Sequence, residues 1–194
     1  MNKKWFKLNG KIKIMNNIKE YNKHISKIYK KFNNDKIPVD IISLCESYNQ
    51  KPLFTNEKKG FPFSCIITKK MLKNQSIDEY EYFLLINDND AMQRRLKVAV
   101  LFSALYMFSN DLCSKDEFEN SIIIRDSVDT DSVIYKFAIM LLCPKFKLEN
   151  IIRASGQTPV SILANIDYQK YVEAFLVSHL DFEYRLKMLV DEDV

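Results

Sequence analysis

The sequence predicts a mainly helical α+β fold, and three observations lead to that prediction. Apolar residues recur at the three- and four-residue spacing of amphipathic helices near both ends and in the middle of the chain. Only two segments, residues 60–68 and 80–87, have the aromatic and β-branched content of strands. The apolar share of 47% and the charged share of 28% are those of an ordinary globular protein. Strands that stand between helices without regular alternation are typical of the α+β class.

The first expected element is an amphipathic helix over residues 16–32, which Asn33, Asn34 and Asp35 end. Its apolar face holds Ile18, Tyr21, Ile25, Ile28, Tyr29 and Phe32. Residues 1–36 carry eleven lysines against two acids, about +9, which leaves about −5 for the remainder because the total is +4. This basic arm is either a solvated helix face or a nucleic-acid contact. In the second case the candidate contacts are Lys3, Lys4, Lys7, Lys11 and Lys13.

The next elements are a short helix and two extended segments. Residues 37–49 continue a helical apolar pattern, and Pro38 suits the first helical turn. Residues 51–55 are expected to be short and extended. Residues 60–68 predict a strand, which Pro62 places at a sheet edge because proline has no N–H to donate to a second neighbour.

The middle of the chain predicts a second strand and a core helix. A polar turn over 69–79 leads into a strong strand over 80–87, which ends in turn-forming residues. Residues 91–109 predict a long helix whose centre is apolar on every side, so we expect it in the core. A polar, acidic loop is expected over 110–119 and a brief extended piece over 122–125.

The last third is expected to be helical. Thr130 can cap a helix that ends before Pro144, and the residues from Gly156 to Pro159 break the helical pattern that follows. The closing segment has the rhythm of a helix–turn–helix. Acidic residues surround its Arg185 and Lys187, which favours a structural helix pair over one that contacts DNA.

We therefore expect a basic arm with its helix at 1–35, a domain at 36–144 and a helical segment at 145–194 packed on that domain. The four cysteines stand far apart and form no CxxC pair, and neither a secretory signal nor an apolar membrane span is recognisable. These features predict a reduced, cytoplasmic protein. Two distant histidines and three isolated glycines argue against a nucleophilic triad and a phosphate-binding loop.

Four segments, in the right order, resemble the ImmA/IrrE family of metallopeptidase-like proteins. They are Ile-Pro-Val-Asp-Ile-Ile at 37–42, Leu-Ile-Asn-Asp-Asn at 85–89 followed by Arg95, Phe-Ala-Ile-Met-Leu-Leu-Cys-Pro at 137–144, and Val-Ser at 177–178 with Arg185, Leu186 and Leu189. Together they span about residues 36–190. The resemblance implies a zincin-like domain with a small β-sheet and a closing helix–turn–helix-like segment.

The resemblance also locates where the catalytic residues would stand. The family's motif is Arg-Phe-x-x-Ala-His-Glu-x-x-His, in which two histidines bind zinc and the glutamate deprotonates the zinc-bound water. Here that frame begins at Arg95, so Val100 and Ala104 stand at the histidine positions and Leu101 at the glutamate position. The third-ligand position falls at about Val133. We therefore expect no peptidase activity, no metal and no cofactor.

The resemblance implies a regulator that binds a protein without cleaving it. The expected partner is a repressor or a defence component, in a phage, mobile-element or stress setting. Polar segments around 56–60, 69–79 and 110–120 are the expected contact surfaces. The alternative function is nucleic-acid binding through residues 1–36, and the oligomeric state stays open.

Overall fold

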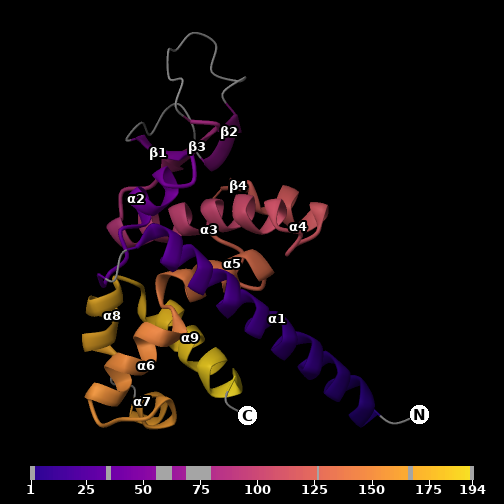
Figure 1. Ribbon diagram of the computed structural model, residues 1–194, viewed down its shortest axis with the longest axis vertical. Helices are drawn as coiled ribbons and strands as arrows, with labels where there is room; N and C mark the ends of the chain where they lie inside the picture. Colours follow the sequence, from indigo (N-terminus) through magenta and orange to yellow (C-terminus); the bar gives the residue numbers. More distant parts are fainter. Residues whose placement is uncertain are drawn as a thin grey trace. The chain divides into compact units, whose positions relative to one another are not determined.

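The computed structural model describes residues 3–33, 36–55, 63–68, 80–125, 127–165 and 168–192, with side chains from residue 17 onward. In these ranges the fold is α+β, with nine helices and a four-stranded mixed sheet (Figure 1). The chain divides into two compact units. One contains residues 36–142, and the other combines residues 1–35 with 143–194. The sequence analysis had not anticipated that the two ends of the chain share a unit.

The sheet belongs to the unit of residues 36–142. Its strands are β1 (Gln50–Thr55), β2 (Ser64–Thr68), β3 (Tyr82–Asn87) and β4 (Ile123–Ile124), in the order β1-β3-β2-β4. β3 runs parallel to β1 and antiparallel to β2. Four consecutive residues of β3, 83–86, are buried, as expected of an inner strand with both faces covered.

The expected edge position of β2 is wrong. β2 lies between β3 and β4, because Ser64 and Cys65 pair with Ile124 and Ile123. The N–H of Ile66 also donates to the Ile122 carbonyl at 3.1 Å, so the contact with the β4 segment continues one residue further along β2. Pro62, on which the expectation depended, lies outside the described residues.

The long central helix has the predicted bounds. α3 (Ala91–Ser109) is buried without interruption from Leu96 to Met107. It packs against β3 on one side and against α5 (Val133–Leu142) on another. Asp90 starts the helix by accepting a hydrogen bond from the backbone N–H of Gln93 at 2.8 Å, which satisfies one of the free donors of the first turn.

Pro38 is not in the first turn of a helix. It follows a cis peptide bond with Ile37, and α2 (Ile41–Glu46) begins only after Asp40. The Asp40 carboxylate accepts from the backbone N–H of Ser43 at 3.1 Å and so caps the helix.

Two further expectations are corrected between α3 and α5. The predicted acidic loop at 110–119 overlaps α4 (Lys115–Ser121), where Ser114 and Glu117 form a reciprocal capping box. Thr130 does not cap α5; the hydroxyl of Ser132 accepts from the backbone N–H of Tyr135 at 3.0 Å. In both places a serine next to the helix supplies the oxygen that the first turn needs.

The second unit is entirely helical in its described part. It consists of α1 (Lys3–Phe32), α6 (Lys145–Ala154), α7 (Pro159–Asn165), α8 (Gln169–Phe175) and α9 (His179–Glu192), and the predicted break between α6 and α7 is confirmed. The apolar face predicted for α1 is largely buried, including Ile25 and Ile28.

A buried arginine ties three helices of this unit together. Arg185 is completely buried; its Nε donates to the Cys143 carbonyl at 3.0 Å and its Nη1 to Glu192 Oε1 at 2.8 Å. Glu192 also accepts from Asn22 Nδ2 at 3.0 Å and lies 3.4 Å from Lys145 Nζ. The ion pair therefore joins α1, α6 and α9.

Candidate functional site

The residues that stand at the expected positions of the first two zinc ligands and the catalytic base lie on α3 and are buried. Val100 is 2% exposed, and Leu101 and Ala104 are completely buried. Along the same helix Tyr106 stacks on Phe137 of α5, with 5.7 Å between ring centroids. The three positions are therefore filled by packed hydrocarbon, and their side chains offer neither a metal ligand nor a group that moves a proton.

The expected third-ligand position lies at the start of α5. Val133 is the first residue of that helix and is half-buried. Ser132 before it caps the helix. Asp131, the nearest carboxylate along the chain, is exposed, and its N–H donates to Asp129 Oδ1 at 3.0 Å. Residues 131–133 therefore lead into the start of α5.

The rest of the described chain contains carboxylates, thiols and imidazoles that could in principle bind a metal or act as nucleophiles. Among the residues that the structure describes, no three His, Cys, Asp or Glu side chains are grouped to hold a metal ion. Burial raises the pKa of Cys113 to about 11 and raises those of Cys45 and Cys65 above their ordinary value. These three thiols are therefore protonated at neutral pH.

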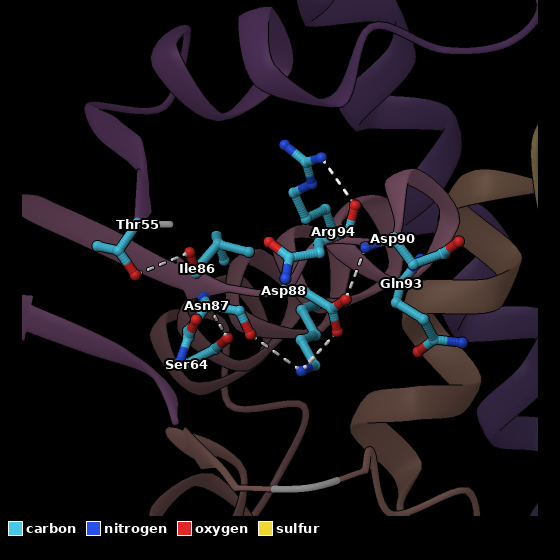
Figure 2. Close-up of polar contacts among 10 residues, drawn as sticks. Thr55, Ser64, Ile86, Asn87, Asp88, Asp90, Gln93 and Arg94 are labelled. Carbon is cyan, nitrogen blue, oxygen red and sulfur yellow. Dashed lines mark hydrogen bonds and ion pairs between the residues drawn. The ribbon is translucent and has the colours of Figure 1, made fainter. Parts of the chain in front are cut away.

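A polar cluster that the sequence analysis missed lies where β3 leads into α3 (Figure 2). Lys97 Nζ lies 2.9 Å from Asp88 Oδ2 and 3.3 Å from the carbonyl oxygen of Asn87. The N–H of Asn87 donates to Ser64 Oγ at 2.9 Å, so β2 is joined to the same point. The Lys97 side chain is only 5% exposed, so its charge needs a partner within the protein. The signal in the sequence was one lysine inside an apolar helix.

Asp88 is held in its ionised form. Burial acts to raise the pKa of Asp88, but hydrogen bonds from Lys97 and from the backbone, with the charge of Lys97, outweigh it and lower the pKa below its ordinary 3.8. Asp88 Oδ1 also accepts from the N–H of Asp90 at 2.9 Å, and Asp90 caps α3. The carboxylate therefore fixes both the turn and the buried lysine.

A pocket of about 340 Å³ lies between α2, β1 and the first two turns of α3. Most of its lining is apolar and comes from all three elements: Ile41, Ile42, Phe54, Ala91 and Val98. The polar part of the lining is Asp40, Arg94 and Arg95. A concave, mainly apolar surface with a few convergent charged groups is the usual form of a binding site.

The polar lining is held by hydrogen bonds within the same unit. Arg95 Nη1 donates to the carbonyl of Val39 at 2.7 Å. Asp40 accepts from Ser43 Oγ at 2.6 Å, and chiefly this hydrogen bond, with a smaller effect of the Arg95 charge, lowers the pKa of Asp40 below 3.8. Arg94 Nη2 donates to the carbonyl of Asn89 at 3.0 Å, and the side chain extends away from Asp88 (Figure 2).

The other expected contact residues are only partly described. Lys3, Lys4, Lys7, Lys11 and Lys13 fall on α1, in the part of the helix whose side chains lie outside the description. Residues 56–60 and 69–79 also lie outside the described residues. The third expected surface, 110–120, contains most of α4.

The closing helices α8 and α9 are joined by a tight turn. Leu176, which joins α8 to α9, has a left-handed backbone with φ of 51°. Leu180 at the start of α9 is 78% exposed, whereas Arg185 is buried against Glu192. Arg185 is thus not on the surface where a nucleic acid could meet it.

None of the helices described here combines the length and the apolar character that crossing a membrane requires. Comparison of the chain with protein-family models, with curated proteins and with solved structures finds no match.

Proposed function

We propose that this chain is a degenerate metallopeptidase of the ImmA/IrrE type that acts by binding a protein partner without cleaving it. The observation that carries the proposal is the burial of Val100, Leu101 and Ala104 inside α3. A peptidase helix with this frame would present two imidazoles and a carboxylate at those positions to a metal and to water. Packed apolar side chains avoid the cost of burying such polar groups without partners, about 1–3 kcal/mol each.

The order and packing of the surrounding elements support the family part of the proposal. β3 ends at Asn87, a polar turn follows, and Arg95 lies in the first turns of α3, as in the family's motif. α5 packs along α3 and ends just before Cys143 and Pro144, which complete the third matching segment. This support is by analogy of arrangement, because many functions share a fold.

Metal analysis tests the loss of catalysis. We expect the purified chain to contain far less than one zinc per molecule after incubation with excess zinc, and its melting temperature to be unchanged by zinc or by a chelator. Ligand binding to the folded state raises stability, so a real site would raise the melting temperature. One tightly bound zinc per chain would contradict the proposal.

Partner binding needs a separate experiment. The tagged chain is used as bait in its native cell, and the main captured protein is then produced in recombinant form. We expect the two purified proteins to form a stoichiometric complex in which the mass of the partner stays intact, with or without a chelator. Cleavage of the partner, or the absence of a complex between the purified proteins, would refute the function.

Nucleic-acid binding remains the second candidate because of one observation on α1. Lys19, Lys23, Lys27 and Lys30 are exposed at spacings of three and four along the helix. Such a row could neutralise phosphates, and the affinity would then fall steeply with salt. Gel-shift titration with DNA and RNA at low and at physiological salt tests this candidate, and no binding at low salt excludes it.

A further inference from the structure

We infer that the pocket between α2, β1 and α3 receives a peptide segment of the partner in which a carboxylate stands next to a bulky apolar side chain. This inference rests on the proposed function, because it names what the protein binding recognises. Three features carry it: the apolar wall of the pocket, the two arginines in its lining, and the single carboxylate in the same lining.

The apolar part of the pocket is large enough for a side chain and is open to solvent. Phe54 and Ile42 are 43% and 39% exposed, whereas Val98 and Ile41 are buried. A volume of about 340 Å³ stands at the lower end of the range of roughly 300–1,000 Å³ found for ligand pockets. That size suits one or two peptide side chains. Exposed apolar residues gathered around a hollow are a common mark of a contact surface.

The charged part of the pocket can take one negative charge. Arg94 and Arg95 contribute two positive charges and Asp40 one negative charge, so the lining has a net charge of +1. Within the described part of the chain Arg94 forms no ion pair, and the one hydrogen bond of its side chain goes to the carbonyl of Asn89. Its Nε is buried and has no hydrogen-bond partner there. A guanidinium whose donors are not all used can bind a carboxylate through charge-assisted hydrogen bonds, often two in parallel.

The same charges disfavour phosphate and nucleic acid. Asp40 is ionised at neutral pH, so the net charge of +1 balances one carboxylate, whereas a doubly charged phosphate would leave an excess negative charge beside Asp40. The apolar wall would also remain uncovered by such ligands. A carboxylate joined to an apolar side chain matches both parts of the lining, and an acidic, apolar stretch of a protein carries that combination.

The test uses N-acetyl-phenylalanine as the smallest probe with both features. Its binding to the full-length chain is followed by backbone amide NMR shifts. We expect saturable shifts at residues 40–42, 54 and 91–98, and binding at least about tenfold weaker for N-acetyl-phenylalanine amide and for acetate, because each lacks one feature. Inorganic phosphate is the competitor.

Variants tie the binding to the pocket. Arg94→Gln should weaken the binding of the probe about tenfold or more. Arg94→Lys should bind more tightly than Arg94→Gln but less tightly than the wild type, because an ammonium group cannot form two parallel hydrogen bonds to one carboxylate. Arg125→Gln removes the same charge from an exposed residue that does not line the pocket and should leave the affinity unchanged. Phe54→Ala should weaken the binding of N-acetyl-phenylalanine and leave the binding of acetate unchanged. Melting temperatures of all variants check the fold.

Several results would overturn the inference: no shifts at the pocket, equal binding of the amide, stronger binding of phosphate, or an unchanged affinity in Arg94→Gln. They would leave the proposed function intact if the captured partner still bound the wild-type chain and Arg94→Gln equally well. A bound zinc or a cleaved partner would instead refute the proposed function, whatever the probe does.

Discussion

Lys97 is a charged residue in the middle of the most apolar helix of the chain. Its side chain is nearly buried, and it lies 2.9 Å from Asp88, which is 21% exposed. Removing one member of a buried ion pair leaves the other with an unbalanced charge, which costs more than the pair itself contributes. The interaction also fixes the turn through which β3 leads into α3.

Replacing Lys97 with methionine should therefore lower the free energy of unfolding by about 1–3 kcal/mol. The loss should be smaller than for a fully buried ion pair, because Asp88 is partly exposed to water. Urea unfolding at pH 7 measures it. The matched control is Lys115→Met, whose partner Glu119 is also exposed, with an expected change within about 0.5 kcal/mol. Equal losses in the two variants would show that the buried pair has no special role.

The effect of Lys97→Met should depend on pH. The pKa of Asp88 in the folded protein is below its ordinary 3.8, so the stabilisation is present above that pH and is lost as the pH falls through the folded value. The difference between wild type and variant should thus shrink when unfolding is measured at about pH 2–3. A difference that stays constant over this range would argue against Asp88 as the partner that matters.

The close packing at the centre of α3 should make the stability of the protein sensitive to substitutions there. Leu101→Ala should destabilise the protein by about 2–5 kcal/mol, because a completely buried leucine is replaced by a cavity that the neighbours fill only in part. Met92→Ala on the same helix, where the side chain is 37% exposed, should change stability by less than about 0.5 kcal/mol. Denaturant unfolding compares them. A loss below about 1 kcal/mol for Leu101→Ala would mean that this position is not packed.

The capping box predicts that α4 depends on one serine. Ser114→Ala removes the hydroxyl that accepts from the N–H of Glu117 at 3.2 Å, which should cost about 0.5–2 kcal/mol. Amide hydrogen exchange should accelerate across α4 more than across α3. Ser109→Ala, at the exposed last residue of α3, is the control and should leave exchange in α4 unchanged. Equal acceleration by both variants would rule out the capping role.

The sequence predicted those elements whose signals are local. The bounds of α3 follow from an apolar run with Asp90 before it and Asn110 after it, and the content of β3 marks it as a strand. α4 was missed because its charged residues show no apolar period. Its helix is stabilised by the cap and by Phe118, which stacks on Phe108 with 4.4 Å between centroids. The inner position of β2 depends on β4, which is distant in sequence.

The candidate site, like the fold, could be predicted from the sequence only in part. The apolar residues at 100, 101 and 104 could be named from the sequence because they stand on one helix at fixed spacing. The pocket could not, since it brings together residues 40–42, 54 and 91–98 from three elements. The role of Asp88 was also missed, because aspartate before a helix is more often a turn residue than the partner of a buried lysine.

The two units differ in how the chain builds them. Residues 36–142 are continuous, whereas the other unit needs both ends, with Asn22 on Glu192 at 3.0 Å and Tyr29 against Phe146 at 5.4 Å. A continuous unit with its own apolar core has what it needs to fold alone. The two end segments contact each other through α1 and α9 and through Tyr29 and Phe146.

A fragment of residues 36–142 should therefore fold cooperatively, while 143–194 should be unfolded until a peptide of residues 1–35 is added. Circular dichroism and NMR dispersion measure both. Glu192→Ala in the longer end fragment should weaken its assembly with the peptide at least about tenfold, because Arg185 would stay buried without its counter-charge. Full folding of 143–194 without the peptide would contradict this account.

The contact between Asn22 and Glu192 has a consequence for synthesis on the ribosome. The apolar face of α1 emerges early, but its partner helix α9 is translated only after the whole of residues 36–142. At roughly 5–20 residues per second, the nascent α1 waits on the order of ten seconds for α9, while the continuous unit can already fold. This interval exposes the new chain to chaperones and to misassembly between neighbouring nascent chains, and the lysines along α1 help to keep it in solution until α9 arrives.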